Sequence, residues 1–486
     1  MTTTDQYFYI GCDPRDPERL LLFKISERLA HMAVVGNTGA GKSHLLIDMC
    51  GQDLFAERGF TVLDAKGDLA DDVLAVIASA PEETWPRLAR EVVIIDPSDP
   101  DCVSAFNPLE VSDPELLPRQ TQDVMATLRR LWRIDDSQTA RMVLVLRRTV
   151  QLLMAHGLTL VEAPRVLTDR SFRDGLVASC DDSELRRFWE LEFPDGKEAL
   201  QWAQSSLNRL GPLLDHPSIR RFLGRPRSTF SFRDIMDSGK VCIISLSRGK
   251  LGHEVAHVMA GLLLMHIQLA AESRQRLPQN ERRPHWLYCD EVQNIAGPTF
   301  EDFLAQARGF GLSLVLAHQH LAQLTSGLRD AIMSNARIKV AFKLSPDDSL
   351  QLSREMFRIT GERVKNRQLA WANIGRLPLP VGYNYQFHSV SEESRQNREA
   401  LQYLQPRQMA VHLAGEPAPY FVRTVDVPRE ELERARGRVA RFKQLVAQVQ
   451  RRDDVDEHAG PLQLAQPERA GTFEWAGRSR RSERAG

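Results

Sequence analysis

The sequence lacks the features that mark secreted and membrane-spanning proteins. Its six cysteines are scattered over 486 residues with no C-x-x-C pair, which favours a reducing cytoplasm over a disulfide framework. No apolar run reaches the ~18 to 20 residues of a membrane span, because the best candidate, 258–271, contains His266 and Gln268. The acidic start of the chain, without a basic n-region, is not that of a signal peptide. We therefore expect a cytoplasmic protein with no integral membrane segment.

Net charge and aromatic residues are also scarce. Lys plus Arg number 63 and Asp plus Glu number 64, which leaves a formal net charge of −1. The chain is therefore not a histone-like polycation, and contacts with nucleic acid must come from local basic patches. Aromatic residues make up 7%, which is lean for a platform that stacks on single strands. What remains is an ordinary globular composition with length for two to three domains.

Short apolar runs alternate with helical patterns along much of the chain. A buried parallel strand reads as a continuous apolar run, because helices cover both faces of its sheet. The alternation therefore predicts a mainly parallel sheet with crossover helices. The predicted strands are His31–Val35, Thr61–Leu63, Glu91–Ile95, Lys240–Leu246, His285–Cys289, Ser313–Leu316 and Arg337–Phe342.

The stretch from Pro114 to Phe222 breaks this alternation, because its patterns are helical throughout. Turn residues flank it, and we predict an inserted all-α domain over 114–222. Beyond Pro428 a charged helix over 429–451 leads into an end rich in Gly, Arg, Ser and Glu. This end has too few apolar residues to order itself, so we expect a disordered tail.

One glycine-rich segment fits the phosphate-loop pattern G-x-x-x-x-G-K-[ST] between a predicted strand and a predicted helix. The context argues against a chance glycine-rich turn. Glycines let backbone N–H groups face phosphates, Lys42 supplies positive charge, and Ser43 offers a hydroxyl to Mg²⁺. The segment therefore predicts binding of ATP and Mg²⁺. Its residues are Gly36, Asn37, Thr38, Gly39, Ala40, Gly41, Lys42 and Ser43.

The predicted strand at 285–289 ends in two carboxylates, Asp290 and Glu291. Beside a phosphate loop, Asp290 is expected to hold Mg²⁺ and Glu291 to act as general base for the attacking water. The alternative is a solvated strand end. The pair favours hydrolysis over a nucleotide-binding switch that never turns over.

Two further residues accompany the strand at 313–316. Gln319 follows the strand at its carboxyl end, where ligands of α/β sheets bind, and is placed to sense the γ-phosphate or orient water. Arg308 precedes the strand and is a candidate arginine finger that reaches a neighbouring subunit. For Arg308 the alternative is a helix-end salt bridge.

The order of these motifs resembles the conjugative coupling proteins of type IV secretion systems, the TraG/TraD group. The resemblance covers roughly residues 7 to 425 and implies that Lys42, Ser43, Asp290, Glu291 and Gln319 match the group's site residues, with Arg308 as the arginine acting across subunits. The segments that carry it are Leu29–Val35 into the phosphate loop, Leu63–Leu69, Ile94–Pro97, Phe106–Leu109, Ser245–Ser247, Asp290–Gln293, Gln306–Arg308 and Ala317–Gln319.

The resemblance implies a HerA–FtsK superfamily ATPase that assembles as a ring, usually hexameric, and pumps DNA through a central channel. The expected fold is α/β: a RecA-like P-loop motor with a mainly parallel sheet and an inserted all-α domain. Residues 1–113 and 223–428 would form the motor, 114–222 the insert and 429–486 the charged helix and tail. This group usually carries N-terminal membrane helices, and this sequence starts almost at the motor. We place the protein in the cytoplasm or peripherally at the inner face of the membrane.

Two other functions compete with this interpretation. A HerA-like translocase could serve repair or anti-phage defence with a nuclease partner instead of a relaxase or secretion channel.

The pattern His253-Glu254-Val255-Ala256-His257 matches the H-E-x-x-H of zinc peptidases. A third zinc ligand is missing downstream of this pattern, so we expect no zinc.

The sequence also offers candidate residues for the DNA-binding surface of the channel. Basic residues that face the channel would hold phosphates without regard to sequence. Candidates in the predicted insert are Arg129, Arg130, Arg133, Arg147 and Arg148, and the alternative is a solvated helix face paired with neighbouring acids.

Overall fold

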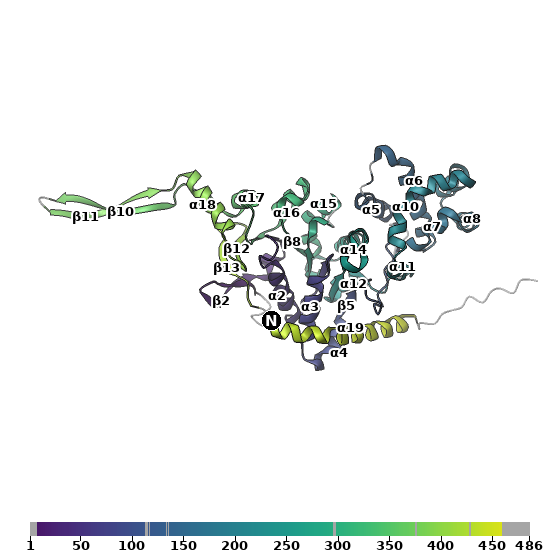
Figure 1. Cartoon of the computed structure of the whole chain (residues 1–486), viewed down its shortest axis with the longest axis horizontal. Coiled ribbons are helices and arrows are strands. Elements are labelled where there is room, and N and C mark those ends of the chain that lie inside the picture. Colours follow the sequence, from purple (N-terminus) through teal and green to yellow (C-terminus); the bar gives the residue numbers. More distant parts are fainter. Residues whose placement is uncertain are drawn as a thin grey trace, which may run out of the picture.

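Seven parallel strands form the centre of a large sheet in the computed structural model, confirming the predicted sheet (Figure 1). The structure describes residues 7–111, 115, 117–132, 134, 136–294, 298–374, 377–426 and 429–458. The central order is β9-β3-β8-β7-β4-β6-β5. These strands are β3 (Met32–Val35), β4 (Phe60–Asp64), β5 (Val92–Ile95), β6 (Val241–Ser245), β7 (His285–Asp290), β8 (Leu312–His318) and β9 (Ile338–Ala341).

An antiparallel edge that the sequence analysis did not predict extends this sheet beyond β9. It adds β12 (Gln408–Leu413), β13 (Tyr420–Arg423), β1 (Tyr7–Asp13) and β2 (Asp16–Lys24), giving eleven strands among the described residues. These strands carry more exposed and polar positions than the central ones, with seven of the nine residues of β2 exposed. Their sequences therefore lack the continuous apolar run of a buried strand.

Successive residues of the central strands face opposite sides of the sheet and enter two separate cores. In β3, Met32 and Val34 join one core, whereas Ala33 and Val35 join the other. The first core lies under α2 (Lys42–Phe55), α3 (Asp68–Ser79), α4 (Trp85–Glu91) and α19 (Arg429–His458). The second lies under α12 (Phe232–Ser238), α14 (His253–Ser273), α15 (Pro298–Gln306), α16 (Ser326–Asn335), α17 (Pro346–Met356) and α18 (Val390–Gln402).

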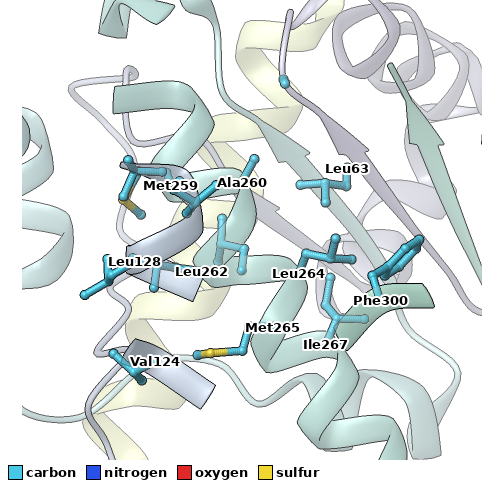
Figure 2. Close-up of a cluster of buried hydrophobic side chains, with 14 of the residues drawn as sticks. Leu63, Val124, Leu128, Met259, Ala260, Leu262, Leu264, Met265, Ile267 and Phe300 are labelled. Atoms are coloured by element: carbon cyan, nitrogen blue, oxygen red, sulfur yellow. The ribbon is translucent and has the colours of Figure 1, made fainter. Parts of the chain in front are cut away.

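An all-helical segment lies between β5 and β6, as predicted. Figure 2 shows Val124 and Leu128 of its first helix beside Met265 of α14, while Leu264 lies toward Leu63 of β4. The insert and the sheet thus share one core. Its helices are α5 (Leu117–Leu131), α6 (Asp136–Ala155), α7 (Ala163–Thr168), α8 (Arg170–Ala178), α9 (Ser183–Arg187), α10 (Gly196–Leu214) and α11 (Pro217–Leu223).

Helix α14 links the insert to the sheet and is the most apolar long helix that the structure describes. With the turn that follows it, residues 253–276 are long and apolar enough to cross a membrane, but 67% of the most apolar window is buried inside the protein. A core helix that packs on two sides produces the same composition.

The predicted charged helix is present as α19 and extends to His458. It packs across α3 and α4: the Phe442 ring meets the Trp85 ring at 5.5 Å, and the Lys443 ammonium lies 3.2 Å from both Asp96 and Asp99 carboxylates. The predicted disordered tail lies outside the described residues.

The Arg28 guanidinium, at the end of α1 (Ile25–Arg28), is fully buried and ties three elements together. Its two terminal nitrogens each donate to Asp53 of α2 at 2.6 Å, and one also donates to the Tyr288 hydroxyl of β7. The guanidinium also stacks 4.8 Å from the Trp286 ring. Removing Arg28 would leave the buried Asp53 carboxylate with a longer contact to Arg58, at 3.5 Å, as its remaining described ion pair.

We predict that Arg28→Ala lowers the free energy of unfolding by about 3–5 kcal/mol, measured by denaturant unfolding. Arg87→Ala is the matched control, because Arg87 pairs with Glu57 at the surface with both side chains more than half exposed, and such pairs contribute little. Equal unfolding midpoints for the two variants would contradict the stabilising role of Arg28.

Candidate functional site

The register of the parallel strands brings the predicted site residues to one edge of the sheet. Val35 of β3 pairs with His318 of β8, and Asp64 of β4 pairs with Asp290 of β7. The phosphate loop follows Val35, Glu291 follows Asp290, and Gln319 follows His318. All three therefore leave the carboxyl edge of the sheet side by side, where ligands of α/β sheets bind.

The phosphate loop curls around the Lys42 side chain. The Lys42 ammonium donates to the backbone carbonyls of Gly36 at 2.6 Å and Asn37 at 3.1 Å. Burial lowers the pKa of Lys42, against the charges of Asp290 and Glu291 that raise it. Gly41 has φ +121°, and a Cβ there would lie 3.1 Å from Cα of Arg407. Glycine is therefore required at this position both for conformation and for space.

Three side chains hold the Glu291 carboxylate. Lys66 and Gln319 each donate to Oε1 at 2.5 Å, and Gln293 donates to Oε2 at 2.8 Å. Burial alone would raise the pKa of Glu291, but the Lys66 and Gln319 hydrogen bonds and the Lys66 charge outweigh burial and lower it. Glu291 also has φ +57°, an unfavourable backbone conformation that is frequent at functional sites.

Asp290 lies in a crowded acidic environment at the end of β7. Burial, followed by the charges of Asp64 and Glu291, raises the pKa of Asp290 to about 6. A divalent cation would relieve this crowding. Magnesium prefers oxygen ligands and usually keeps several waters, so the Asp290 carboxylate and the exposed Ser43 hydroxyl fit a magnesium ion bound with a phosphate group.

The structure does not bring Arg308 to the other predicted site residues. Arg308 lies in the turn before β8 and is exposed. Burial, with a smaller contribution from the Arg308 charge, lowers the pKa of His31, the residue that precedes β3. Arg308 therefore lies near His31, at the amino edge of the sheet. Seven residues of β8 separate it from Gln319, and at about 3.3 Å per residue that is roughly 20 Å. Arg308 therefore cannot reach the phosphate loop of its own chain.

Two residues next to the loop were given no role in the sequence analysis. Lys66 lies in the turn after β4, where the pattern Asp64-Ala65-Lys66-Gly67-Asp68 was a usable signal. Arg407 precedes β12, and its backbone N–H donates to the Ala40 carbonyl at 2.8 Å. It has φ +70°, and its side chain pairs with Asp426. No sequence pattern marks this contact, because it joins residues 367 positions apart.

The H-E-x-x-H pattern lies at the start of α14. The rings of His253 and His257 are 6.2 Å apart. Among the residues that the structure describes, no group of three His, Cys, Asp or Glu side chains could hold a metal ion. The expectation that the protein binds no zinc stays a prediction.

The candidate DNA-binding arginines of the insert differ in their surroundings. Arg147 is exposed, whereas the Arg148 guanidinium lies 5.5 Å from the Phe188 ring and donates to Gln151. Burial lowers the pKa of Arg130. Arg148 thus has a packing role within the insert, and Arg133 lies outside the described residues.

Comparison with protein families gives a match to the DNA-binding domain of type IV secretion-system coupling proteins over residues 21–368. The chain belongs to this family. It contains the phosphate loop and the acidic strand end of a P-loop NTPase within a family defined by DNA binding. No curated protein matches the chain.

Solved structures of the coupling protein TrwB share the fold. The bacterial conjugative coupling protein TrwBdeltaN70 in its unbound form has 17% identity and a TM-score of 0.59, covering 88% of this chain and 90% of that chain. The plasmid coupling protein TrwB in complex with ADP and Mg²⁺ has 18% identity and a TM-score of 0.56, covering 84% and 87%. These matches confirm the RecA-like P-loop fold with its all-helical domain.

We predict different failures for two substitutions in the site. Lys42→Ala abolishes nucleotide binding, because the positive charge inside the loop is lost. Glu291→Gln binds ATP but turns it over at least about 10²-fold more slowly, because the base is lost while the other loop contacts survive. Binding is measured with a fluorescent ATP analogue and turnover by phosphate release.

Glu57→Gln is the control for Glu291→Gln, since Glu57 is an exposed carboxylate remote from the loop. A Glu291→Gln protein that hydrolysed ATP at the wild-type rate would show that another group is the base.

Proposed function

We propose that this protein is an ATP-driven DNA motor that assembles as a ring, hexameric in the arrangement we favour, and pumps DNA through a central channel for type IV secretion. The observation that carries the proposal is the position of the Glu291 carboxylate, which lies beside a complete phosphate loop and accepts a hydrogen bond from Gln319. A carboxylate so placed favours hydrolysis over simple nucleotide binding. Family membership supports DNA as the molecule that is moved.

In this mechanism the phosphate loop binds and orients the triphosphate. Its backbone N–H groups and the start of α2 face the phosphates, and Lys42 turns from the Gly36 carbonyl toward their negative charge. Ser43 and Asp290 would hold Mg²⁺, which neutralises charge on the β- and γ-phosphates when it is bound. Glu291 takes a proton from the water as the water oxygen bonds to the γ-phosphorus and the bond to the β-phosphate oxygen breaks. Gln319 orients Glu291 and the water.

Lys66 restrains the base before hydrolysis. Both Glu291 oxygens accept hydrogen bonds from side chains, and the Lys66 ammonium supplies the strongest, charge-assisted contact at 2.5 Å. A carboxylate held this way is a weak proton acceptor. We propose that DNA binding releases Lys66 from Glu291 and that this release is the step that DNA stimulates.

The corresponding prediction is that Lys66→Met lowers the ratio of DNA-stimulated to basal ATP turnover several-fold, because the basal state loses its restraint. Lys66→Arg is the control, since it keeps a cationic donor. The ratio comes from phosphate release with and without duplex DNA. An unchanged ratio in Lys66→Met would remove Lys66 from the regulation of the base.

Assembly is part of the proposal because of the position of Arg308. The roughly 20 Å that separate it from its own site along β8 leave a neighbouring subunit as the site it can serve. An arginine that acts across subunits stabilises the charge of the transition state and barely affects ATP binding. Its exposure at the amino edge supports this assignment.

We predict that Arg308→Ala lowers turnover ~10³-fold or more and that mixing it with Glu291→Gln restores part of the activity. In mixed rings some junctions combine an intact Glu291 with an intact Arg308 from the next subunit. Native mass spectrometry checks that mixed rings form. Mixed rings without activity above the separate mutants would make Arg308 a structural helix-end charge.

We place the motor in the cytoplasm, or peripherally at the inner face of the membrane, with a secretion channel and a relaxase as its protein partners. The family match favours this setting over a translocase that works with a nuclease. Size measurements with and without ATP and DNA would establish when the ring forms.

A further inference from the structure

A two-stranded hairpin, β10 (Val364–Ile374) and β11 (Leu377–Phe387), extends away from the body of the molecule (Figure 1). It pairs with no other described strand. Figure 1 places the hairpin and the helical insert at opposite ends of the longest axis. An isolated hairpin is at best marginally stable in water. Its exposed side chains are therefore available for a contact outside the folded body.

The two faces of the hairpin differ in chemistry. On one face, Leu369 pairs with Tyr383 and Arg367 pairs with Tyr385. Alternation along the strands adds Trp371 and Phe387 to this face. Its apolar and aromatic side chains are 44% to 58% exposed. The opposite face has small or uncharged polar residues: Asn366, Gln368, Ala370, Gly382, Asn384 and Gln386.

The aromatic face is a row of rings with positive charge around it. The Tyr383 and Tyr385 rings are 6.4 Å apart, and the Tyr385 and Phe387 rings are 6.5 Å apart. The Arg367 guanidinium lies 3.4 Å from the centre of the Tyr383 ring. Residues 363–391 contain four Lys or Arg and no Asp or Glu. Lys365 pairs with Glu392 at 2.7 Å, and Arg367 is the basic residue that contacts the described rings of this face.

We propose that the aromatic face of the hairpin binds single-stranded DNA by stacking bases on its rings. This inference rests on the proposed function, because it names a part of the motor that contacts DNA. The ring spacing is about twice the ~3.4 Å repeat of stacked bases in a duplex, which leaves room for an unstacked base against each ring. Base stacking on aromatic side chains beside Arg and Lys is the general mode of sequence-independent single-strand binding.

The same features argue against other occupants. In a duplex the bases stack on one another, so they are not available to protein rings. A neighbouring protein subunit would be matched as well by aliphatic side chains, yet aromatic rings outnumber the aliphatic partners Leu369 and Val364 in the register of the described hairpin. The Arg367 guanidinium, stacked on the Tyr383 ring, fits a phosphate beside a stacked base.

The test measures binding of a fluorescent oligo-dT to the full-length protein by anisotropy. The combined variant Trp371→Ala/Tyr383→Ala/Tyr385→Ala removes three rings and is expected to weaken binding at least tenfold, since each base stacked on a ring contributes about 1–3 kcal/mol. The matched control Asn366→Ala/Gln368→Ala/Asn384→Ala changes the opposite face and leaves binding unchanged. Tyr385→Phe keeps the affinity, whereas Tyr385→Leu keeps apolar surface and loses affinity.

Several outcomes would overturn the hairpin proposal. These are absence of oligo-dT binding by the wild-type protein, equal affinity of the three-ring and control variants, or full affinity of Tyr385→Leu. If the three-ring variant keeps its oligo-dT affinity but no longer forms oligomers in native mass spectrometry, the face contacts a neighbouring subunit. If it keeps that affinity but no longer binds anionic lipid vesicles, the face contacts a membrane.

Duplex-stimulated ATP turnover of the same preparations separates this proposal from the proposed function. If duplex DNA stimulates turnover in both the wild-type protein and the three-ring variant, and both bind oligo-dT equally well, the hairpin proposal is refuted and the motor proposal stands. If oligo-dT binding depends on the rings but the wild-type protein does not turn over ATP, the hairpin proposal is supported and the motor proposal is refuted.

Discussion

The register of the parallel strands is the constraint on which the whole site depends. Val35 pairs with His318 and Asp64 pairs with Asp290. Asp290 in turn pairs with Ala317, the residue before His318, so these strands end within one residue of each other. A slip of one residue would exchange the two faces of a strand. Met32 and Val34 would then leave the core that they share with α2 and α3. Burial on both faces therefore fixes where the phosphate loop meets the acidic pair.

At this edge Glu291 has an unfavourable backbone conformation, and the surrounding contacts hold it in place. Glu291 adopts φ +57°, which for a residue other than glycine costs about 1–3 kcal/mol. The Lys66, Gln319 and Gln293 hydrogen bonds offset this cost, and Arg407 fixes the loop from the other side through the Ala40 carbonyl. The Glu291 carboxylate and the phosphate loop are thus held in place by donors from other elements.

The sequence was sufficient for the buried centre of the molecule and failed at its exposed parts. The seven central strands were predictable because burial on both faces requires continuous apolar runs. Strand β2 and the β10–β11 hairpin face solvent and do not carry that signal, since stretches such as Lys365–Gln368 are polar. The phosphate loop and Glu291 follow from local patterns. The pairing of Lys66 with Glu291 depends on β4 lying beside β7, which no local pattern specifies.

The arrangement of the two edges of the sheet bears on how hydrolysis and DNA contact would be coupled. The segment before the hairpin is anchored where the Arg358 N–H donates to the Pro417 carbonyl, just beyond Leu413, which pairs with Ile338 at the amino end of β9. The hairpin base and Arg308 thus share the edge opposite the phosphate loop. If Arg308 serves a neighbour's nucleotide, that contact and the hairpin base lie at the same edge of the sheet. In the proposed ring, DNA contact at the hairpin and transition-state stabilisation by Arg308 would then both face a neighbouring subunit across this edge.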